Sequence, residues 1–551
     1  MARTSHPLAF LALAAAIAAW AHDVPQSPQI RVSTRLVQLG VIARDKDGLV
    51  QDLTKDDFIV LDQGKSRQIS VFSVESGKST AIPQLAKLLP PNTFSDLPQY
   101  GAGKPRSVTI VLLDNLNTLY GSAPESKYEA TPFWVEDLAL QRAKTHLIEF
   151  IKTLDPRDRV AIYGLRDSLR VLCDFTNDHA QLLGILSKYD TSSATNRAIV
   201  EPGRRTAPDF DGRPDPFAVA AENEAAFTVA GMANDARNEE TMAALQSIAA
   251  HLANILGRKN LVWLTANLPF SGAAMARVLS PANIAVYPVD ARGLLASSTS
   301  LQTIYGTAPY DDVSGASGHR DNMPGQSSQP IGIAPMEKVA EETGGQAFVN
   351  TNDITGAIRK AVEDSEVTYT LGFYLDASSL DGKFHEIKVQ SKRKGVTLRY
   401  PKGYFAYKDD AASQDRNQQV LLTSLRSPVE SSLIPLEARV DRVTQPEPNS
   451  LNLSCAIDIR NIRFAQDGGL RKGAIAVYTI EQDAIGKVLQ KSERAFNLQF
   501  TDNQYAVLLK TGMLFHQTVH LRAGTTTLRL LVEDPSTSNV GSLIIRLSEV
   551  K

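Results

Sequence analysis

Residues 107–365 alternate short apolar runs with segments of helical periodicity, and this alternation limits the fold more than any other feature of the chain. The run Val108–Leu113 is almost wholly apolar, which is typical of a strand buried on both faces of a parallel sheet. Segment 241–256 places its apolar residues three and four positions apart, as an amphipathic helix does, and Gly257 follows as a helix-ending residue. Strand and helix in this order predict a doubly wound, Rossmann-like α/β domain over residues 107–365.

Both flanks of this region show the patterning of antiparallel sheets. Residues 28–75 predict an N-terminal β domain, in which the turn Asp45–Gly48 favours a hairpin. Residues 366–405 predict further strands, which either extend the α/β domain or complete the N-terminal one. Residues 430–551 alternate apolar and polar residues in short segments and predict a C-terminal β-sandwich of the immunoglobulin-like kind. The expected fold class is therefore multidomain, with an α/β core between two β-sandwich domains.

Four segments rich in polar residues, proline and glycine interrupt these patterns. Residues 76–106 and 406–429 are predicted to be linkers between domains. Inside the α/β region, residues 190–234 and 296–330 are predicted to be long loops. Loops of this length are usually either functional or disordered. The composition favours disorder or a surface cap over a binding loop, and both interpretations stay open.

The N-terminus has the pattern of an export signal. Arg3 precedes the apolar run Leu8–Trp20, and Ala19–Ala21 places small residues where a signal peptidase cleaves. We therefore expect residues 1–21 to be a signal peptide and His22 to begin the mature chain. An uncleaved membrane anchor is the alternative, although the run is shorter than the ~20 residues that span a bilayer. No later segment is long and apolar enough to span, so the protein is expected in the periplasm, at the cell surface or outside the cell.

Composition excludes some classes of partner. Lysine and arginine number 58 against 60 acidic residues, for a net charge of −2, and no dense basic run is present. Nucleic acid is therefore not an expected partner. The chain has two cysteines, Cys173 and Cys455, which fall in separate predicted strands. We expect both to be small buried side chains without a disulfide between them.

Several segments of residues 28–406 together resemble the VWFA-related domain family described mainly from Acidobacteria, whose core is similar to the von Willebrand factor A (VWA) domain. The resemblance implies a VWA-like fold and a secreted protein, in a family whose biochemical role is poorly defined. The segments that carry it are Leu53–Phe58, Leu113–Thr118, Arg159–Tyr163, Gly257–Leu264, Val286–Leu294, Ala340–Gly345, Tyr369–Tyr374, Asp381–Phe384 and Arg399–Phe405.

The resemblance also implies a metal-ion-dependent adhesion site at the carboxyl ends of the parallel strands. The family pattern is Asp-x-Ser-x-Ser after the first strand, a threonine on a second loop and an aspartate on a third. Asp114 matches the first aspartate and Thr118 the second serine, whereas Leu116 and Ala266 stand where oxygen ligands should be. Thr195 is a candidate for the loop threonine. Such a site would take Mg²⁺ or another divalent cation, because these ions prefer oxygen ligands.

Two interpretations of this site stay open. In the first, Asp114, Thr118 and Asn117 form a weak or altered cation site. In the second, which the missing ligands favour, the site is degenerate and Asp114 caps a helix or holds a loop. Asp290 ends another predicted strand, but Arg292 is close enough in sequence to pair with it.

No catalytic constellation is evident elsewhere in the sequence. His516 and His520 are four residues apart, but their surroundings predict a strand, and the glutamate of a His-Glu-x-x-His zinc motif is absent. Nucleotide-binding glycine motifs are also missing. The sequence therefore favours a binding protein over an enzyme.

Three functions remain as hypotheses. The first is an exported VWA-domain protein that mediates protein–protein interaction or adhesion through a degenerate metal site. The second is a hydrolase or enzyme-accessory protein with a site between the core and a sandwich, for which a buried carboxylate pair of shifted pKa in a cleft would be evidence. The third is a structural envelope component assembled by strand addition at sandwich edges.

Overall fold

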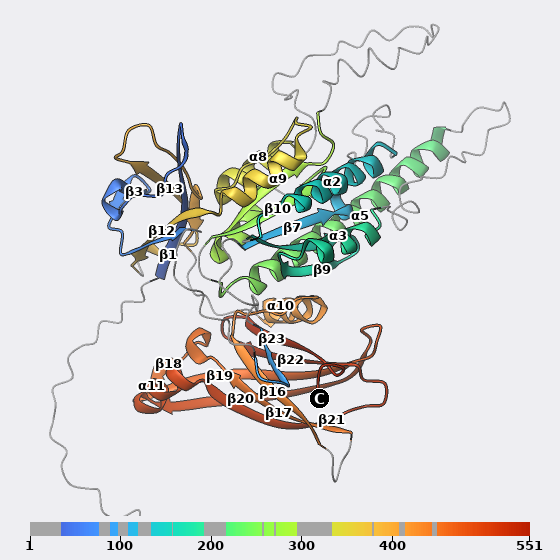
Figure 1. Ribbon diagram of the computed structural model, residues 1–551. Helices are drawn as coiled ribbons and strands as arrows, with labels where there is room; N and C mark the ends of the chain where they lie inside the picture. The colour runs from blue at the N-terminus through green and yellow to red at the C-terminus, as the bar shows by residue number, and fades with distance from the viewer. Residues whose placement is uncertain are drawn as a thin grey trace, which may run out of the picture.

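The computed structural model groups five sheets and their helices into an N-terminal β unit, a central α/β unit and a C-terminal β unit (Figure 1). The predicted signal peptide, residues 1–21, lies outside the described residues, as does the predicted loop 296–330. The described residues are 35–76, 89–96, 108–118, 134–156, 158–191, 216–255, 258–268, 272–294, 333–376, 379–406, 414–443 and 449–551.

The N-terminal unit is built from two stretches of sequence that flank the α/β region. β1 (Arg35–Asp45) pairs antiparallel with β12 (Val367–Leu375), and β3 (Phe58–Asp62) pairs antiparallel with β13 (Phe384–Ser391). Of the two arrangements left open for residues 366–405, these strands therefore adopt the one that joins the N-terminal segment. The remaining strands of the unit are β2 (Gly48–Leu49), β4 (Lys65–Arg67), β5 (Val71–Ser76), β14 (Thr397–Arg399) and β15 (Gly403–Phe405).

The central unit has a five-stranded sheet in the order β11-β10-β7-β8-β9. β7 (Val108–Asp114), β8 (Arg159–Leu165), β10 (Lys259–Thr265) and β11 (Ile284–Asp290) are parallel, and β9 (Leu169–Thr176) is antiparallel to β8. Every residue of β7, β10 and β11 is buried, as their continuous apolar sequences require.

Helices cover both faces of this sheet, and each face has its own hydrophobic core. On one face the core is shared with α2 (Trp134–Lys152), α3 (His179–Lys188) and α9 (Ile354–Glu363). On the other face it is shared with α5 (Pro216–His251), α6 (Gly272–Leu279) and α8 (Ile333–Thr343).

Two segments expected to lack regular structure contain helices. The predicted loop 190–234 is helical from Pro216, where α5 begins, and Figure 1 shows α5 projecting beyond the sheet. Proline is favoured in the first turn of a helix, and the alanine- and glutamate-rich sequence that follows it propagates one. The predicted linker 406–429 contains α10 (Gln414–Arg426). Buried Arg529 donates to the carbonyl oxygens of Ser424 and Leu425 at the end of α10, where helical partners are lacking.

The C-terminal unit packs two antiparallel sheets around one core. The first has the order β21-β17-β16-β6 and the second the order β18-β19-β22-β23, with β20 paired to β19. The strands are β6 (Thr93–Ser95), β16 (Leu436–Val443), β17 (Ser450–Ile457), β18 (Ala465–Asp467), β19 (Leu470–Gln482), β20 (Val488–Thr501), β21 (Met513–His520), β22 (Thr527–Asp534) and β23 (Asn539–Arg546), and α11 (Asp502–Thr511) joins β20 to β21.

The predicted linker 76–106 contributes a strand to this distant unit. β6 pairs antiparallel with β16, and the neighbouring Asp96 is buried against the same strand. The backbone N–H of Leu436 donates to Asp96 Oδ1 at 2.9 Å, whereas Asp96 Oδ2 has no hydrogen-bond partner among the described residues. Burial raises the pKa of the Asp96 carboxyl to about 9, so this group is protonated in the folded protein at neutral pH.

Replacing Asp96 by asparagine should remove a pH-dependent contribution to stability. The carboxyl titrates near 3.8 when unfolded and near 9 when folded, so its contribution is complete below about pH 3.8 and is lost as pH rises toward 9. The melting temperature of Asp96→Asn, measured from pH 4 to 9, should therefore rise relative to the wild type with increasing pH. Asp467→Asn removes an exposed carboxyl whose pKa is lowered by Lys472, and it should not show this rise. If the difference in melting temperature between Asp96→Asn and the wild type stays constant from pH 4 to 9, Asp96 is ionised in the folded protein over that range.

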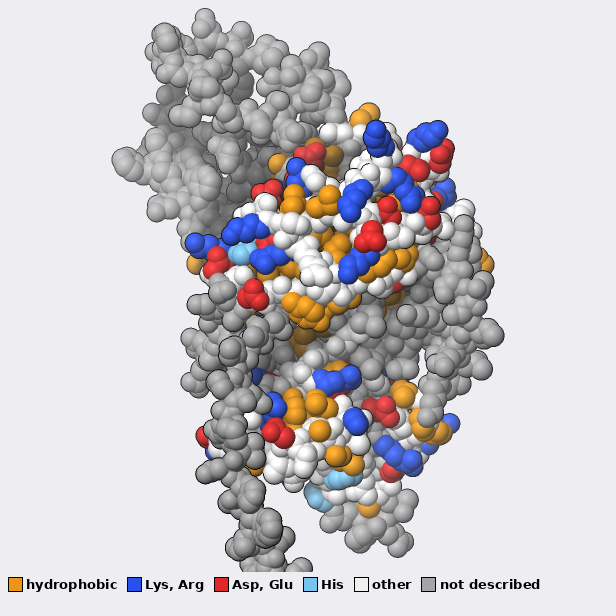
Figure 2. All heavy atoms as spheres, turned by 90° about the vertical axis from the view of Figure 1, so that its left-hand side faces the viewer, with side chains coloured by type: hydrophobic (Ala, Val, Ile, Leu, Met, Phe, Trp, Pro, Cys, Tyr) orange, Lys and Arg blue, Asp and Glu red, His pale blue; other side chains and the backbone are white. Residues whose placement is uncertain are grey.

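The units meet at defined places on the sheet. Gly40 of β1 lies against Arg258 and Asn283, the residues directly before β10 and β11, so the N-terminal unit covers the amino edge of the parallel sheet. At the end of α5, the backbone N–H of Ser432 donates to Ala250 O at 3.1 Å and its hydroxyl to His251 O at 3.0 Å. These bonds use helix carbonyls that lack helical partners and join the α/β unit to the C-terminal unit. Figure 2 shows positive and negative side chains intermixed on the face formed by the two β units.

A buried carboxylate organises the junction with the N-terminal unit. Asp364, which follows α9 and is fully buried, accepts hydrogen bonds from Arg44 and Arg399 of the N-terminal unit and from the hydroxyl of Tyr287 on β11. The distances are 2.7 Å from Arg44 Nη2 to Asp364 Oδ1 and 3.1 Å from Tyr287 Oη to Asp364 Oδ2. Buried Arg258 donates to the same Tyr287 hydroxyl at 3.1 Å and to Gly40 O at 3.2 Å. The two units therefore share one polar network.

Candidate functional site

The carboxyl edge of the parallel sheet contains the residues expected to bind a cation. Asp114 ends β7 and is fully buried, and Asn117 is buried in the short helix α1 (Asn115–Thr118) that follows. Thr118 is the last residue of α1, and its side chain is not among those described. Thr195 lies outside the described residues. The described part of the predicted site is therefore Asp114 with Asn117.

Both carboxylate oxygens of Asp114 accept hydrogen bonds from protein donors. Oδ1 accepts the backbone N–H of Asn117 at 2.9 Å, which caps the first turn of α1. Oδ2 accepts the side-chain amide of Asn117 at 3.0 Å and the indole N–H of Trp263 at 2.8 Å. Trp263 lies on β10 and is fully buried, and its indole is a donor that cannot bind a cation.

The same cluster fixes the neighbouring elements. The side-chain amide of Asn117 also donates to the hydroxyl of buried Thr241 on α5, at 3.0 Å. Asn115 donates to Thr191 O at 3.0 Å and accepts the Tyr189 hydroxyl at 2.7 Å. Burial, followed by the nearby charge of Asp114, raises the pKa of Tyr189 to about 12, so this hydroxyl remains a donor at neutral pH. Asp114 is thus the centre of a hydrogen-bonded hub between β7, β10 and α5.

The electrostatics of the hub disfavour an exposed, charged carboxylate. Burial raises the pKa of Asp114, while hydrogen bonds from Asn117 and Trp263 oppose the shift. A cation at Asp114 would have to compete with the Trp263 and Asn117 donors at Oδ2 and with the backbone N–H of Asn117 at Oδ1. Among the described residues, no group of three histidine, cysteine, aspartate or glutamate side chains is placed to hold a metal ion.

Replacing Trp263 by phenylalanine should destabilise the fold by removing the indole hydrogen bond and part of the buried ring system. Asp114 Oδ2 loses the donor at 2.8 Å, which should cost about 1–3 kcal/mol of unfolding free energy, and the lost packing of the indole adds to this cost. Denaturant unfolding monitored by circular dichroism measures this cost. Tyr163→Phe on β8 removes a buried hydroxyl from the same sheet and serves as the control. An equal loss in both variants would mean that the Trp263 bond has no special importance.

The other sequence candidates occupy structural roles. Asp290 accepts from the backbone N–H and the Nε of Arg292 at 3.0 and 2.9 Å, the pairing that their sequence separation suggested. His516 and His520 lie on β21 and bond separately to Ser454 and Ser450, each at 2.9 Å. Cys173 and Cys455 are buried and free, as expected.

Buried carboxyls of raised pKa do not form a catalytic pair among the described residues. Asp96, Asp114 and Glu533 are buried and have a raised pKa. Asp114 belongs to the α/β unit, whereas Asp96 and Glu533 belong to the C-terminal unit, where neither carboxyl contributes to the pKa shift of the other. None of the three lines the cavity beside Lys402 or the cavity beside His385. The evidence that would have favoured a hydrolase is therefore not seen in this part of the chain.

Sequence reasoning did not identify Trp263, Thr241 or Tyr189 as members of the site. Trp263 lies within Gly257–Leu264, a segment already noted for its resemblance, but as part of a buried strand it was assigned only to the core. Thr241 contacts Asn117 and Tyr189 contacts Asn115, each from a position far away in sequence. Only the packing of α5 and of the chain after α3 brings these side chains to the carboxyl edge.

Comparison with known proteins gives loose structural similarity. No family model and no curated protein matches the chain. An aerotolerance-related membrane protein from Bacteroides fragilis is 12% identical, with a TM-score of 0.24, over 47% of this chain and 98% of its own. BatB from Bacteroides thetaiotaomicron is 13% identical, with a TM-score of 0.24, over the same shares. A von Willebrand factor type A protein from Catenulispora acidiphila is 8% identical, with a TM-score of 0.26, over 78% of this chain and 73% of its own.

Among the described residues, no helix is both long enough and apolar enough to cross a bilayer.

Proposed function

We propose that this protein is an exported binding protein of the bacterial envelope, whose α/β unit presents the carboxyl edge of its sheet to a protein partner without the help of a metal ion. In open α/β sheets, ligand sites lie at the carboxyl ends of the strands. The N-terminal unit covers the opposite, amino edge through Gly40 and Arg258. The carboxyl edge is therefore the part of the sheet left for recognition.

The proposal rests on the hydrogen bonds that the Asp114 carboxylate accepts. Metal-dependent adhesion needs an aspartate oxygen free to bind the cation and an open place for the partner's carboxylate. Here the indole of Trp263 and the side-chain amide of Asn117 both donate to Oδ2, at 2.8 and 3.0 Å, and the backbone N–H of Asn117 donates to Oδ1 at 2.9 Å. This arrangement supports a hub that holds the edge rigid, with recognition left to the surrounding surface.

Two exposed hydrophobic residues mark that surface. Leu294, just beyond the carboxyl end of β11, is 65% exposed, and Met232, on the part of α5 that projects from the sheet, is 67% exposed. At a ligand-binding edge, such side chains would be suitable anchors for a protein partner.

Binding through this edge is tested with purified mature protein and detergent-solubilised envelope proteins from the source organism. Leu294→Glu and Met232→Glu should each weaken recovery of the cross-linked partner about tenfold or more, both in EDTA and in Mg²⁺. Ile485→Glu, at a site 87% exposed on the C-terminal unit, is the matched control and should leave recovery unchanged. Loss of the partner in EDTA would refute recognition without a metal ion. Loss of the partner in the Ile485 variant alone would refute binding through the carboxyl edge.

Export is a separate part of the proposal and rests on the N-terminal sequence. Cleavage after Ala21 should give a mature protein that begins at His22. Mass spectrometry of the protein recovered from periplasmic, membrane and culture-medium fractions tests both the cleavage site and the compartment. An intact N-terminus on cytoplasmic protein would contradict this part.

A structural role has one observation in its favour. Among the described strands, β20 pairs only with β19, so this long strand has one unpaired edge. Strand addition there would build an assembly of copies or partners. Concentration-dependent cross-linked oligomers that disappear when proline replaces Phe496, on β20, would support assembly over binding by the α/β unit.

A further inference from the structure

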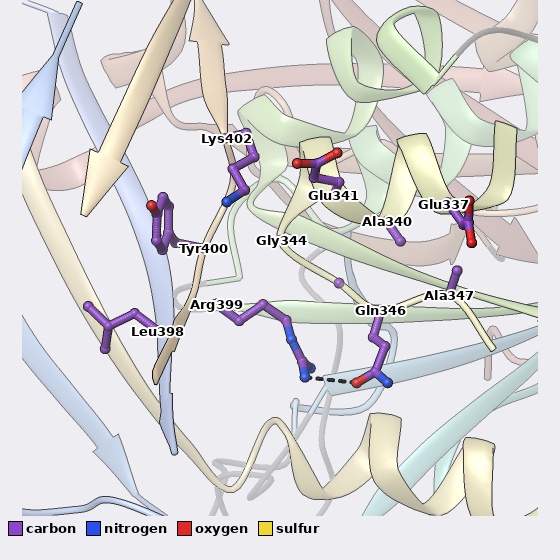
Figure 3. Close-up of a pocket in the computed structure, with 11 residues that line it drawn as sticks. Glu337, Ala340, Glu341, Gly344, Gln346, Ala347, Leu398, Arg399, Tyr400 and Lys402 are labelled. Atoms are coloured by element: carbon purple, nitrogen blue, oxygen red, sulfur yellow. Dashed lines mark hydrogen bonds between the residues drawn. The ribbon is translucent and has the colours of Figure 1, made fainter. Parts of the chain in front are cut away.

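A cavity of about 350 Å³ lies between the α/β unit and the N-terminal unit (Figure 3). One wall is formed by α8 and the residues after it, including Glu337, Glu341 and Gln346, and the other by Arg399 and Lys402 of the N-terminal unit. The two walls come from Ala340–Gly345 and Arg399–Phe405, segments singled out in the sequence whose chemistry the carboxyl edge does not use. Cavities at such boundaries between units are common sites for small ligands.

The floor of the cavity is closely packed. A side chain on Gly344 would meet Pro401 N at 2.6 Å, so the backbones of the two units are in direct contact there. Arg399 is held by Asp364 and by Gln346, whose Oε1 accepts from Arg399 Nη2 at 2.8 Å (Figure 3). The guanidinium group is therefore fixed in place before any ligand binds.

Opposite charges face each other across the cavity. Glu337 and Glu341 are one helical turn apart on α8, and within the described ranges neither forms an ion pair. On the other wall, the Lys402 ammonium lies 5.0 Å from the centre of the Tyr400 ring and likewise forms no ion pair with a described residue. Figure 3 shows Lys402 and Glu341 on the two sides of the opening.

The adjoining network adds positive charge to the basic wall. Arg44 and Arg399 pair with Asp364, and Arg258 joins the same network through the Tyr287 hydroxyl, so this network holds three guanidinium groups and one carboxylate. An anionic group at Arg399 and Lys402 would offset that excess, while a cationic group would pair with Glu337 and Glu341.

We propose that this cavity binds a small zwitterion, the size of a free amino acid or dipeptide, with its carboxylate at Lys402 and Arg399 and its ammonium at Glu341 and Glu337. A dianion would meet the two glutamates, and a dication would meet Lys402 and Arg399, so each would place like charges together. Because the ligand would contact both units, it would stabilise their junction. This inference does not depend on recognition at the carboxyl edge, which lies at the other end of the sheet.

The test uses three four-carbon probes that differ in charge and two further zwitterions that differ in length. 4-Aminobutyrate carries both charges, whereas succinate and putrescine, of the same chain length, carry two like charges. Glycine and 6-aminohexanoate carry both charges at a shorter and a longer separation. At millimolar concentration, at least one amino acid should raise the melting temperature by about 2–4 °C in a saturable way, because it binds only the folded state. Succinate and putrescine should not do so.

Two variants connect the effect to the cavity. Lys402→Ala and Glu341→Gln should each weaken the calorimetric Kd of the bound amino acid about tenfold or more, through loss of one charge-assisted contact. Lys394→Ala, in an exposed turn of the same unit outside the cavity, should leave the Kd unchanged. The proposal is overturned if no amino acid binds, if succinate or putrescine binds as tightly, or if Lys402→Ala and Glu341→Gln bind like the wild type. Loss of partner binding in the Leu294 and Met232 variants tests the carboxyl edge separately.

Discussion

Replacing Asp364 by alanine should lower the unfolding free energy by about 2–4 kcal/mol and release the N-terminal unit from the α/β unit. The carboxylate is fully buried and accepts hydrogen bonds from Arg44, Arg399 and Tyr287. Without it, the two guanidinium groups remain at the junction without an acceptor. Their side chains keep 28% and 26% of their surface exposed, so water compensates for part of the loss. This partial compensation places the expected cost below that of a fully buried pair.

Calorimetry and limited proteolysis would measure this effect together. The Asp364→Ala variant should show an earlier melting transition and faster cleavage between β12 and the end of α9. Asp364→Asn keeps one acceptor oxygen, so its melting temperature and cleavage rate should lie between those of Asp364→Ala and the wild type. Asp376→Ala, at an exposed position after β12, is the matched control and should change neither readout. Wild-type stability in Asp364→Ala would mean that the junction is held by apolar contacts alone.

Replacing Asp114 by alanine should cost about 2–4 kcal/mol, because it leaves several buried donors without an acceptor. The indole N–H of Trp263 and the backbone N–H of Asn117 both lose their partner, at 2.8 and 2.9 Å in the native protein. The side-chain amide of Asn117 keeps only its bond to Thr241. Relief of the buried carboxyl, whose pKa burial raises, offsets part of this cost.

Chemical denaturation followed by tryptophan fluorescence suits this variant, because Trp263 reports on the hub directly. Asp174→Ala, at an exposed position on β9, is the control and should be within about 0.5 kcal/mol of the wild type. If Asp114→Ala were as stable as the control, the hub would contribute nothing to the fold.

The sequence predicted those helices and strands whose apolar pattern lies within a single short segment. Val108–Leu113 and Asn260–Thr265 are buried strands because their apolar runs leave no polar face, and periodicity alone identified the end of α5. It did not identify the first half of α5, because the polar, proline- and glycine-rich residues before Pro216 dominated the interpretation of the whole segment. Helix α10 was missed for the same reason, although Val420, Leu421 and Leu425 pack on the C-terminal unit.

Contacts between distant segments were beyond sequence reasoning. β6 was expected to be part of a linker, because three residues carry too weak a pattern to show that they pair with β16, more than 300 positions away. The same is true of Asp364, whose importance comes from arginines of another unit. At the candidate site, the sequence identified Asp114 and showed that Leu116 and Ala266 stand at two positions where the family pattern has oxygen ligands. The sequence could not show that the indole of Trp263 donates a hydrogen bond to Asp114, because residue type alone does not tell where a side chain points.

Titration of the mature protein with Mg²⁺, Mn²⁺ and Ca²⁺ after treatment with EDTA tests the metal-free hub most directly. The melting temperatures of the wild type and Asp114→Asn should respond alike to each ion, because no cation needs the Asp114 carboxylate. A bound metal at 100 times its dissociation constant would stabilise the folded state by about 2.7 kcal/mol. A saturable rise of that order in the wild type, absent from Asp114→Asn, would contradict the account and show that Asp114 holds a functioning cation site.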